Sequence, residues 1–510
     1  MLPIDFLHRG LRRNPDAIAV EGETGEELTY RQLVRRVEAV AVGLQRLAPE
    51  PQARVAICAD NTTEHLIALL ATMAAGQVWV PLNPRLGRLD IEGMIEASRP
   101  AVVVADESHA GLLSQVRAPL VVAKAEGGGA SADGVAALAA RFKGEQPAAR
   151  RLSPEDLQAI KFTSGSSGRA KGVMQSYRCW NTHIACMLHG FGFSGDDRFL
   201  VAAPLTHGTS CFMMPILAQG GRLILIERAR PAAILDVFAR RDVSATFLPP
   251  TVIYGMLAEP GVSGTAYPKL RHLIYGAAPM PAEKIRAAQA VFGEVVEAAY
   301  GQAEAPQIIT CLRAHEMILE ENLASAGRPS LLTRVAIVDG DGAFLGPDEP
   351  GEIVVHGDLL MNGYLDRPEL TAETIVDGWL HTGDVGFMDE RGYLFIKDRL
   401  HDVVISGGFN VYPADVEAVL SGHPAVHECV VFGVSDDKWG ERVEAAVEIS
   451  AETEADAGEL IGFVREMLGP VKAPKRIHFY AELPRSAVGK VLRREVKAAA
   501  EAGGEPATET

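Results

Sequence analysis

Short apolar runs rich in β-branched residues alternate with helix-like stretches through the first 300 residues of the chain. The apolar runs are 54–58 (RVAIC), 78–82 (VWVPL), 101–105 (AVVVA), 223–226 (LILI), 245–248 (ATFL) and 272–275 (HLIY). Helical patterns lie between them, for example at 64–75 and 231–241. Strands that are apolar throughout and separated by helices are typical of parallel sheets with helices on both faces. The pattern therefore predicts an α/β fold.

The pattern changes near residue 335, where short β-like segments take over. They lie at 335–338, 352–356 and 393–397, with Asp-Gly turn signals at 339–342. These segments predict a small β-barrel or sheet over about 335–400. The last part of the chain has predicted helices at 414–421 and 458–468 and predicted strands at 430–434 and 444–449. We therefore predict a large domain over 1–400 and a smaller α+β domain over 401–510.

Two segments have weak patterns. Residues 126–149 are rich in Gly and Ala, and we interpret them as a loop or a loosely packed surface segment. Residues 498–510 (AAAEAGGEPATET) have little apolar content, and we expect a frayed tail.

Composition and charge narrow the function classes. Hydrophobic residues are 47% and charged residues 23% of the 510 residues, which is ordinary for a globular protein and argues against a mainly disordered chain. The 49 basic and 66 acidic residues give a net charge of −17. A strongly acidic chain is a poor general binder of nucleic acid, because binding to phosphates requires a basic face. A small anionic ligand is still compatible, since it responds to local charges only.

The cysteines and the apolar runs indicate the cellular compartment in which the protein is expected. None of the six cysteines forms a CxxC pair, which argues against a zinc or dithiol redox site. Scattered thiols fit a reducing compartment. The first ten residues show no leader pattern, and the longest apolar run, 66–76, is shorter than the roughly 20 residues that cross a bilayer. We expect a soluble cytoplasmic protein without a transmembrane segment.

The segment 160–173 (IKFTSGSSGRAKGV) carries the clearest chemical signal. Glycines allow successive backbone N–H groups to turn toward an anion, hydroxyls add donors, and Lys171 can contact the same phosphates. The loop is not a Walker A motif, because Gly172 follows the lysine, and it contains no GxSxG nucleophile frame. Taken alone, it is also compatible with a flexible Ser/Gly turn and a surface lysine.

Residues 163–172 (TSGSSGRAKG) resemble the phosphate loop of the adenylate-forming (AMP-binding) superfamily, which includes acyl-CoA synthetases, amino-acid adenylation domains and luciferases. Four further segments resemble that family's motifs in the family's order: 300–304 (YGQAE), 382–384 (TGD), 399 and 402 with 406–413 (SGGFNVYP), and 484–490 (PRSAVGK). The resemblance spans nearly the whole chain and is to the fatty-acid or aryl-acid CoA ligase branch. It implies that the smaller C-terminal domain is mobile.

The resemblance implies a reaction in two steps. A carboxylate attacks the α-phosphorus of ATP, which releases pyrophosphate and leaves an acyl-adenylate. The thiol of coenzyme A then displaces AMP and forms a thioester. The implied cofactors are ATP, Mg²⁺ and coenzyme A, and the implied partner is a small carboxylic acid. Because two anions react, catalysis must come mainly from positioning and from well-placed cations.

Site residues follow from the same motifs. The resemblance implies that the β- and γ-phosphates are bound by Thr163, Ser164, Gly165, Ser166, Ser167, Gly168 and Lys171. It implies that the rest of the acyl-nucleotide contacts Gly276, Ala277, Ala278, Tyr300, Gly301, Gln302, Ala303, Asp384 and Arg399. In this set Tyr300 would stack on adenine, and Asp384 and Arg399 would bind the ribose hydroxyls. The carboxylate of Glu304 would bind Mg²⁺, although by itself it resembles an ordinary helix-start acid.

The C-terminal residues are assigned in the same way. Lys490 would bridge the carboxylate and the α-phosphate during adenylation and leave when the small domain rotates about His401. The thiol channel would be lined by Gly407, Gly408 and Phe409. The phosphates of coenzyme A would need a basic surface, for which the candidates are Lys438, Arg442, Lys472, Lys475 and Arg476. Each of these is also compatible with an ordinary solvated face.

Three positions depart from the family pattern. Ala170 replaces the usual proline of the loop, and His401 stands where relatives carry Asp or Lys. Ala303 replaces the motif's threonine, so one hydroxyl near the α-phosphate is missing. We expect a water or Gln302 to substitute for it.

The acid is partly constrained. His207 stands where acyl-CoA synthetases often carry a gating histidine, and we count it with Lys490 and Glu304 as catalytic, although a structural loop histidine is the alternative. Gly208 occupies the place where amino-acid-activating relatives have Asp, which predicts an acid without an α-ammonium group. The predicted pocket involves the helix 180–188 with Met187, Phe247 and Pro306, which suits an aliphatic or aromatic acid. We find no cationic partner there for a second carboxylate.

Two other functions stay open at this stage. The acyl group could pass to the phosphopantetheine arm of a carrier protein, or the chain could be a non-catalytic nucleotide-binding relative, as Ala303 would allow. The sequence also leaves a homodimer open.

Overall fold

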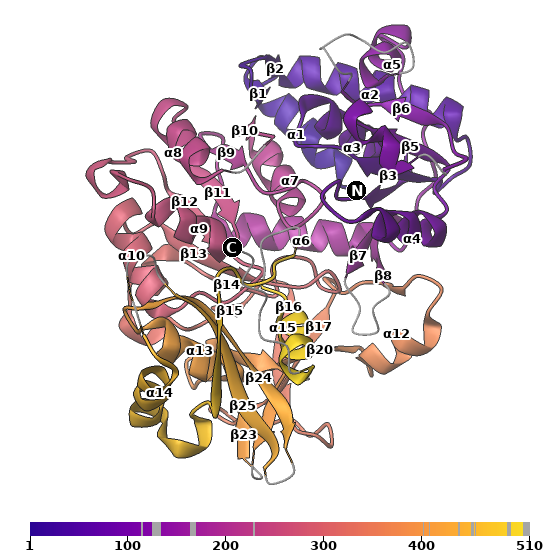
Figure 1. Cartoon of the computed structure of the whole chain (residues 1–510). Helices are drawn as coiled ribbons and strands as arrows, with labels where there is room; N and C mark the ends of the chain where they lie inside the picture. The colour runs from indigo at the N-terminus through magenta and orange to yellow at the C-terminus, as the bar shows by residue number, and fades with distance from the viewer. Residues whose placement is uncertain are drawn as a thin grey trace.

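The computed structural model describes residues 1–113, 116–124, 134–163, 170–227, 230–400, 402–406, 409–436, 439–449, 453, 455–486 and 491–502. Two large sheets with their helices form the indigo-to-magenta part of the chain in Figure 1. The orange-to-yellow part below them contains two smaller sheets. The fold is therefore the mixed α/β architecture that the sequence predicts.

A seven-stranded sheet contains the apolar runs from the beginning of the chain. In spatial order its strands are β18 (Gly363–Tyr364), β8 (Lys171–Ser176), β7 (Leu157–Thr163), β4 (Val78–Pro81), β3 (Arg54–Cys58), β5 (Val102–Ala105) and β6 (Leu120–Val122). The pairs from β7 to β6 are parallel, whereas β8 and β18 are antiparallel. The helices along this part of the chain are α2 (Tyr30–Leu47), α3 (Thr63–Ala74), α4 (Arg88–Ser98), α5 (Val135–Arg141) and α6 (Tyr177–Phe191).

A nine-stranded sheet contains the remaining predicted runs of the large domain. In spatial order its strands are β15 (Arg328–Pro329), β14 (Thr310–Leu312), β13 (Val296–Tyr300), β12 (His272–Tyr275), β11 (Ala245–Leu248), β9 (Arg198–Val201), β10 (Arg222–Leu225), β1 (Ile18–Glu21) and β2 (Glu27–Thr29). The strands from β13 to β1 are parallel. Its helices are α1 (Ile4–Arg13), α7 (Ser210–Gln219), α8 (Pro231–Arg240), α9 (Pro250–Leu257), α10 (Ala282–Phe292) and α11 (Ala314–Met317).

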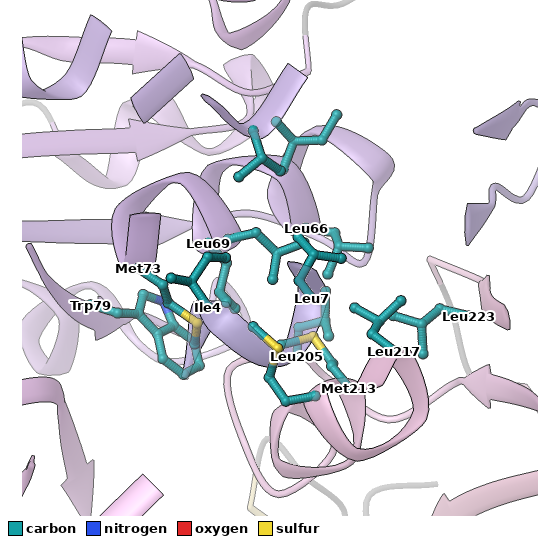
Figure 2. Packing of buried hydrophobic residues seen from close by; sticks show 14 of the residues in the cluster. Ile4, Leu7, Leu66, Leu69, Met73, Trp79, Leu205, Met213, Leu217 and Leu223 are labelled. Carbon is teal, nitrogen blue, oxygen red and sulfur yellow. The ribbon is translucent and has the colours of Figure 1, made fainter. Parts of the chain in front are cut away.

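One continuous core joins the two large sheets. Figure 2 shows Leu7 of α1 between Leu66 of α3 and Leu217 of α7, and all three side chains are fully buried. Trp79 of β4 lies at the edge of this group beside Met73. Truncating such a leucine to alanine costs about 2–5 kcal/mol, because a cavity is left behind. The two large sheets therefore share one buried core.

The smaller sheets follow the change of pattern near residue 335. The first is antiparallel and consists of β16 (Thr333–Val338), β17 (Gly351–Gly357), β20 (Trp379–Met388), β19 (Ile375–Val376) and β21 (Leu394–Arg399), with helix α12 (Pro368–Thr374) beside it. The second consists of β23 (Phe409–Val411), β22 (Val404–Ser406), β25 (Gly440–Ile449), β24 (Val426–Asp436) and β26 (Arg476–Tyr480). Its helices are α13 (Pro413–Ser421), α14 (Ala457–Lys472) and α15 (Arg493–Glu501).

Two expectations about weak segments are wrong in part. The predicted loop over 126–149 contains α5, whose Val135 and Leu138 are buried against the main core. This helix is short, and its apolar positions lie among alanines. The helical pattern in the sequence is therefore weak. The predicted frayed tail begins later than expected, because α15 continues to Glu501. No helix of the described residues is both long enough and apolar enough to cross a membrane.

Candidate nucleotide and acid site

Three predicted site segments follow directly on strands of the large sheets. β7 ends at Thr163, before the phosphate loop, while β12 ends at Tyr275 and β13 at Tyr300. Because β12 and β13 are adjacent and parallel, the segments 276–278 and 300–304 begin at the same edge of one sheet. The carboxyl edge of parallel strands is where such folds bind ligands.

Close backbone packing explains the small residues at this edge. A Cβ atom on Gly276 would lie 2.6 Å from the carbonyl oxygen of Ala299, and one on Gly301 would lie 2.5 Å from the backbone of Gln307. A side chain is therefore excluded at both positions. Ala277 has a φ of 69°, a conformation that non-glycine residues seldom adopt. Backbone strain of this kind is often found at functional sites.

Asp384 is the centre of a buried polar cluster that unites three predicted motifs. Its carboxylate accepts hydrogen bonds from the hydroxyl of Tyr300 (2.6 Å) and from Nε2 of Gln302 (2.7 Å). Its other oxygen lies 2.7 Å from Nε of Arg399, its register partner on β21. Asp384 is 4% exposed, whereas about half of the Arg399 side chain is exposed. The guanidinium can therefore contact a ligand while it stays paired.

The protonation of Tyr300 follows from this environment. Burial, and then the negative charge of Asp384, raise the pKa of Tyr300 well above its ordinary value. The phenol is therefore protonated at neutral pH and donates to the carboxylate. The hydrogen bond of this hydroxyl fixes the tyrosine ring at the end of β13. A ring that stacks on a planar ligand needs such a fixed position.

Glu304 and Lys171 meet at a residue that the sequence analysis missed. The hydroxyl of Tyr364 donates to Oε1 of Glu304 at 2.8 Å, and Nζ of Lys171 lies 5.5 Å from the centroid of the Tyr364 ring. Burial and the charge of Glu304 raise the pKa of Tyr364. Its position results from the pairing of β18 with β8, where Tyr364 lies opposite Val173. This pairing joins segments about 190 residues apart, so local pattern does not indicate it.

The surroundings of Ala303 correct one expectation. Gln302 donates through Nε2 to Asp384 and to the carbonyl of Thr382, so this nitrogen does not replace the missing hydroxyl. The carbonyl of Ala303 instead accepts a hydrogen bond from the buried Gln175. Gln175 in turn accepts one from Trp180. Position 303 is therefore anchored through its backbone.

His207 lies in the turn before α7. Its Nδ1 is 2.9 Å from the hydroxyl of Thr206, and its carbonyl accepts a hydrogen bond from Ser210 (2.7 Å). Surrounding protein atoms, and then the positive charges of Lys161 and Arg85, lower the pKa of His207 to about 4. The side chain of His207 is nevertheless exposed to solvent. The imidazole is therefore neutral at pH 7.

The residues predicted to line the acid pocket lie in different surroundings. A Cβ atom on Gly208 would lie 2.5 Å from Oε1 of Gln307 and 3.1 Å from the Phe247 ring, so an aspartate does not fit there without rearrangement. Pro306 is buried beside this segment. Met187 is fully buried in the main core, which does not place it at the surface of an open pocket.

Several predicted residues lie outside the described part of the chain. They are Ser164, Gly165, Ser166, Ser167, Gly168, His401, Gly407, Gly408, Lys438 and Lys490. Phe409 is described and is 62% exposed.

The candidate basic residues of the small domain are mostly engaged within it. Arg442 pairs with Glu444 and Asp436, and Lys472 pairs with Asp415. Arg476 is exposed, and it is the candidate that could contact a phosphate without breaking these ion pairs.

Arg493 at the start of α15 connects the C-terminal helix with the end of the large domain. Its guanidinium lies 3.2 Å from Asp398, 2.7 Å from Asp402 and 2.7 Å from Glu417. The carboxylates raise the pKa of Arg493 far above its ordinary value, against the effect of burial. The described structure thus places the segment after Lys490 next to the predicted pivot.

Comparison with known sequences agrees with these motifs. The profile of the family described as AMP-binding enzyme matches residues 7–365, and that of the AMP-binding enzyme C-terminal domain matches residues 415–490. The chain is 36% identical to a protein named feruloyl-CoA synthase from an Amycolatopsis species, over 96% of this chain and 97% of that protein.

Comparison with solved structures gives the same result. ATP-bound MatB from Rhodopseudomonas palustris superposes with a TM-score of 0.90 at 29% identity, over 98% of this chain and 99% of MatB. The o-succinylbenzoate CoA synthetase MenE from Bacillus subtilis, in complex with its acyl-adenylate intermediate, has a TM-score of 0.85 at 27% identity, over 96% of this chain and 97% of MenE.

Proposed function

This chain belongs to the AMP-binding enzyme family, and we propose that it is an acid–thiol ligase of the acyl-CoA synthetase type. It joins an organic carboxylic acid to AMP from ATP, releases pyrophosphate, and transfers the acyl group to coenzyme A. The acid is aliphatic or aromatic and lacks an α-ammonium group, because Gly208 offers no carboxylate to bind one and Gln307 fills the space beside it.

One observation carries this proposal: residues of motifs far apart in sequence meet at one edge of the large domain. Tyr300 and Arg399 meet at Asp384, while Lys171 and Glu304 meet at Tyr364. A non-catalytic relative would have no physical reason to keep both clusters. The second cluster combines a cation and a carboxylate, which is what the proposed binding of phosphates and Mg²⁺ requires.

The first step requires two anions to approach each other. Lys171 neutralises charge on the phosphates, and Lys490, assigned from its motif alone, contacts the reacting carboxylate. One oxygen of Glu304 accepts a hydrogen bond from Tyr364, and the other has no side-chain partner in the described part of the chain, so it can be a ligand. Such a carboxylate suits Mg²⁺, which when bound with ATP neutralises phosphate charge. Asp384 and Arg399 orient the nucleotide, which holds the α-phosphorus in place for attack.

The second step requires a path for the thiol. In this proposal the smaller domain rotates after adenylation, so that Lys490 leaves the site and Phe409 with its neighbouring glycines lines the path of coenzyme A. The large exposed surface of Phe409 is consistent with a ring that packs against a ligand or another surface of the protein in a second orientation.

The test measures carboxylate-dependent release of pyrophosphate from ATP across a panel of acids, followed by thioester formation with coenzyme A. We expect at least one acid to be active, and Lys490→Ala to lower the adenylation rate by about 100-fold or more. Lys497→Ala is a matched control, since Lys497 follows closely and its ion pairs among the described residues, with Glu441 and Glu501, are both 3.9 Å long.

Two results would contradict the proposal. Failure of every acid to release pyrophosphate would exclude the ligase function, and full activity of Lys490→Ala would exclude the assigned mechanism. If a phosphopantetheine-bearing carrier protein accepts the acyl group and coenzyme A does not, transfer to a carrier replaces the second step.

A further inference from the structure

Lys161 is a buried charged residue that the proposed mechanism does not use. It lies on β7 two residues before Thr163, so both side chains point to the same face of the sheet. Lys161 is 8% exposed. Its Nζ lies 5.2 Å from the ring centroid of Trp79 and 5.4 Å from that of Trp180. The ammonium is thus close to two indole rings, and its strand ends at Thr163.

The described residues offer Lys161 no carboxylate within ion-pair distance. Its hydrogen bond goes to the hydroxyl of Ser210 at 3.0 Å, and the sulfur of Cys211 is a weak acceptor at 3.8 Å. Burial of an ammonium without a counter-ion is costly. Two indole faces offset part of this cost. They leave the net positive charge in place.

The surroundings of Lys161 add further positive potential. Ser210 is the first residue of α7, and the N-terminus of a ten-residue helix carries a partial positive charge. Lys161 and Arg85 act on His207, and Lys161 also acts on His183, so that burial and these charges lower both histidine pKa values to about 4. The charged side chains acting on the two imidazoles are therefore cationic.

Two buried polar donors around Lys161 have no hydrogen-bond partner among the described residues. They are Nε1 of Trp79 and the hydroxyl of Thr209. Both belong to the same neighbourhood, because the Trp79 ring faces the ammonium and Thr209 precedes Ser210. An indole N–H only donates, and a hydroxyl can donate. Unused donors around an unpaired cation suit the oxygens of an anion.

We propose that the acid activated by this protein carries a second anionic group, and that Lys161 with the start of α7 binds it. The substrate class is then a dicarboxylic acid rather than a simple monocarboxylic acid. This inference depends on the proposed ligase function. It replaces the expectation that the pocket has no cation for a second carboxylate, which arose because Lys161 lies within an apolar strand pattern.

The inference is tested by comparing each acid with one that carries a second carboxylate. Matched pairs such as benzoate with terephthalate, and hexanoate with adipate, provide one aromatic and one aliphatic comparison.

The experiment measures kcat/KM for pyrophosphate release with both acids of each pair. We expect the wild-type protein to prefer the diacid in at least one pair. In Lys161→Met, which keeps the length of the side chain but removes its charge, the ratio of diacid to monoacid kcat/KM should fall by about 10- to 100-fold, because a charge-assisted hydrogen bond is lost. The change should be mainly in KM for the diacid.

Lys284→Met is the matched control. Nζ of Lys284 lies 5.6 Å from the ring of Tyr254, so this variant also removes a cation–π contact, but on α10. We expect it to leave the diacid-to-monoacid ratio unchanged.

The outcomes separate the inference from the function on which it rests. A wild-type preference for the monoacid in every pair, or an unchanged ratio in Lys161→Met, overturns the inference while the ligase function stands. If no acid supports the release of pyrophosphate from ATP, both the inference and the ligase function are wrong. If Lys161→Met does not fold, the wild-type preference decides alone.

Discussion

Asp384 and Lys161 are both buried charged residues beside the proposed site, but their surroundings differ. The carboxylate of Asp384 is bound by Tyr300, Gln302 and Arg399, which the fold itself supplies. The ammonium of Lys161 has one hydroxyl and two indole faces, and no carboxylate in the described part of the chain. The first charge is balanced before any ligand arrives, whereas the second is balanced only by an added anion.

The difference indicates separate tasks. A fully bonded carboxylate is fixed in position, so it can orient a nucleotide common to every acid substrate. An unbalanced cation in a dry site discriminates among ligands by charge, because the wrong ligand leaves it unpaired. Substitution of Asp384 should therefore lower kcat/KM to a similar extent with every acid. Substitution of Lys161 should change the order of the acids by kcat/KM.

The largest expected effect comes from neutralising the balanced charge. Asp384→Asn keeps the shape of the side chain but removes the charge that pairs with Arg399. We expect kcat/KM for ATP to fall by roughly 100-fold or more with every acid. Steady-state pyrophosphate assays with several acids measure it. A loss confined to one acid would contradict the division of tasks.

Acid pH should destabilise the fold, in part through a buried histidine close to Lys161. Burial lowers the pKa of His183 and of His65 to about 4, from an ordinary value of 6.5. The unfolded chain therefore binds more protons between these values, and stability falls as the pH drops from 6.5 toward 4, by about 3 kcal/mol for each histidine. Asp106, whose pKa is raised to about 6, opposes this trend in part.

Urea unfolding at several pH values tests this prediction and links it to Lys161. The charge of Lys161 contributes to the low pKa of His183 but not to that of His65. In Lys161→Met the acid-dependent loss of stability should therefore be smaller than in the wild type. An equal or larger loss would show that the ammonium does not act on His183.

Glu304 is an intermediate case, a carboxylate with one side-chain donor among the described residues. In Glu304→Gln we expect the Mg²⁺ concentration for half-maximal activity to rise by about 10- to 100-fold, because a metal ligand loses its charge. Magnesium titrations of the adenylation rate measure it. Tyr364→Phe is the control that removes only the hydrogen bond and should have a smaller effect.

The smallest expected effect comes from removing one of the donors to Asp384. Tyr300→Phe keeps the aromatic ring but loses the hydroxyl that donates to the carboxylate. We expect KM for ATP to rise by about 10-fold, in line with one hydrogen bond to a charged group. An unchanged KM together with an unchanged melting temperature would mean that Gln302 and Arg399 alone fix Asp384.

The sequence predicts those features that depend on local pattern. The strand β3 coincides with its predicted run, and the motif residues Tyr300, Asp384 and Arg399 are close together as their assignment implies. Tyr364 and Lys161 were not identified, because their importance arises from strand pairing and from side chains on distant helices. The assigned roles of the motif residues remain predictions.

The ion pairs of Arg493 would be affected by any rotation of the small domain about residue 401. The guanidinium of Arg493 forms an ion pair with Asp398, which precedes residue 401 and belongs to the large domain. It also pairs with Asp402 and Glu417, which follow residue 401. Turning the small domain would separate Arg493 from Asp398 while its contacts with Asp402 and Glu417 are kept. The same rotation would break the hydrogen bond from the backbone N–H of Ala414 to Asp398 and the ion pair of Lys397 with Asp415, so Asp398 would lose partners on both α13 and α15 together.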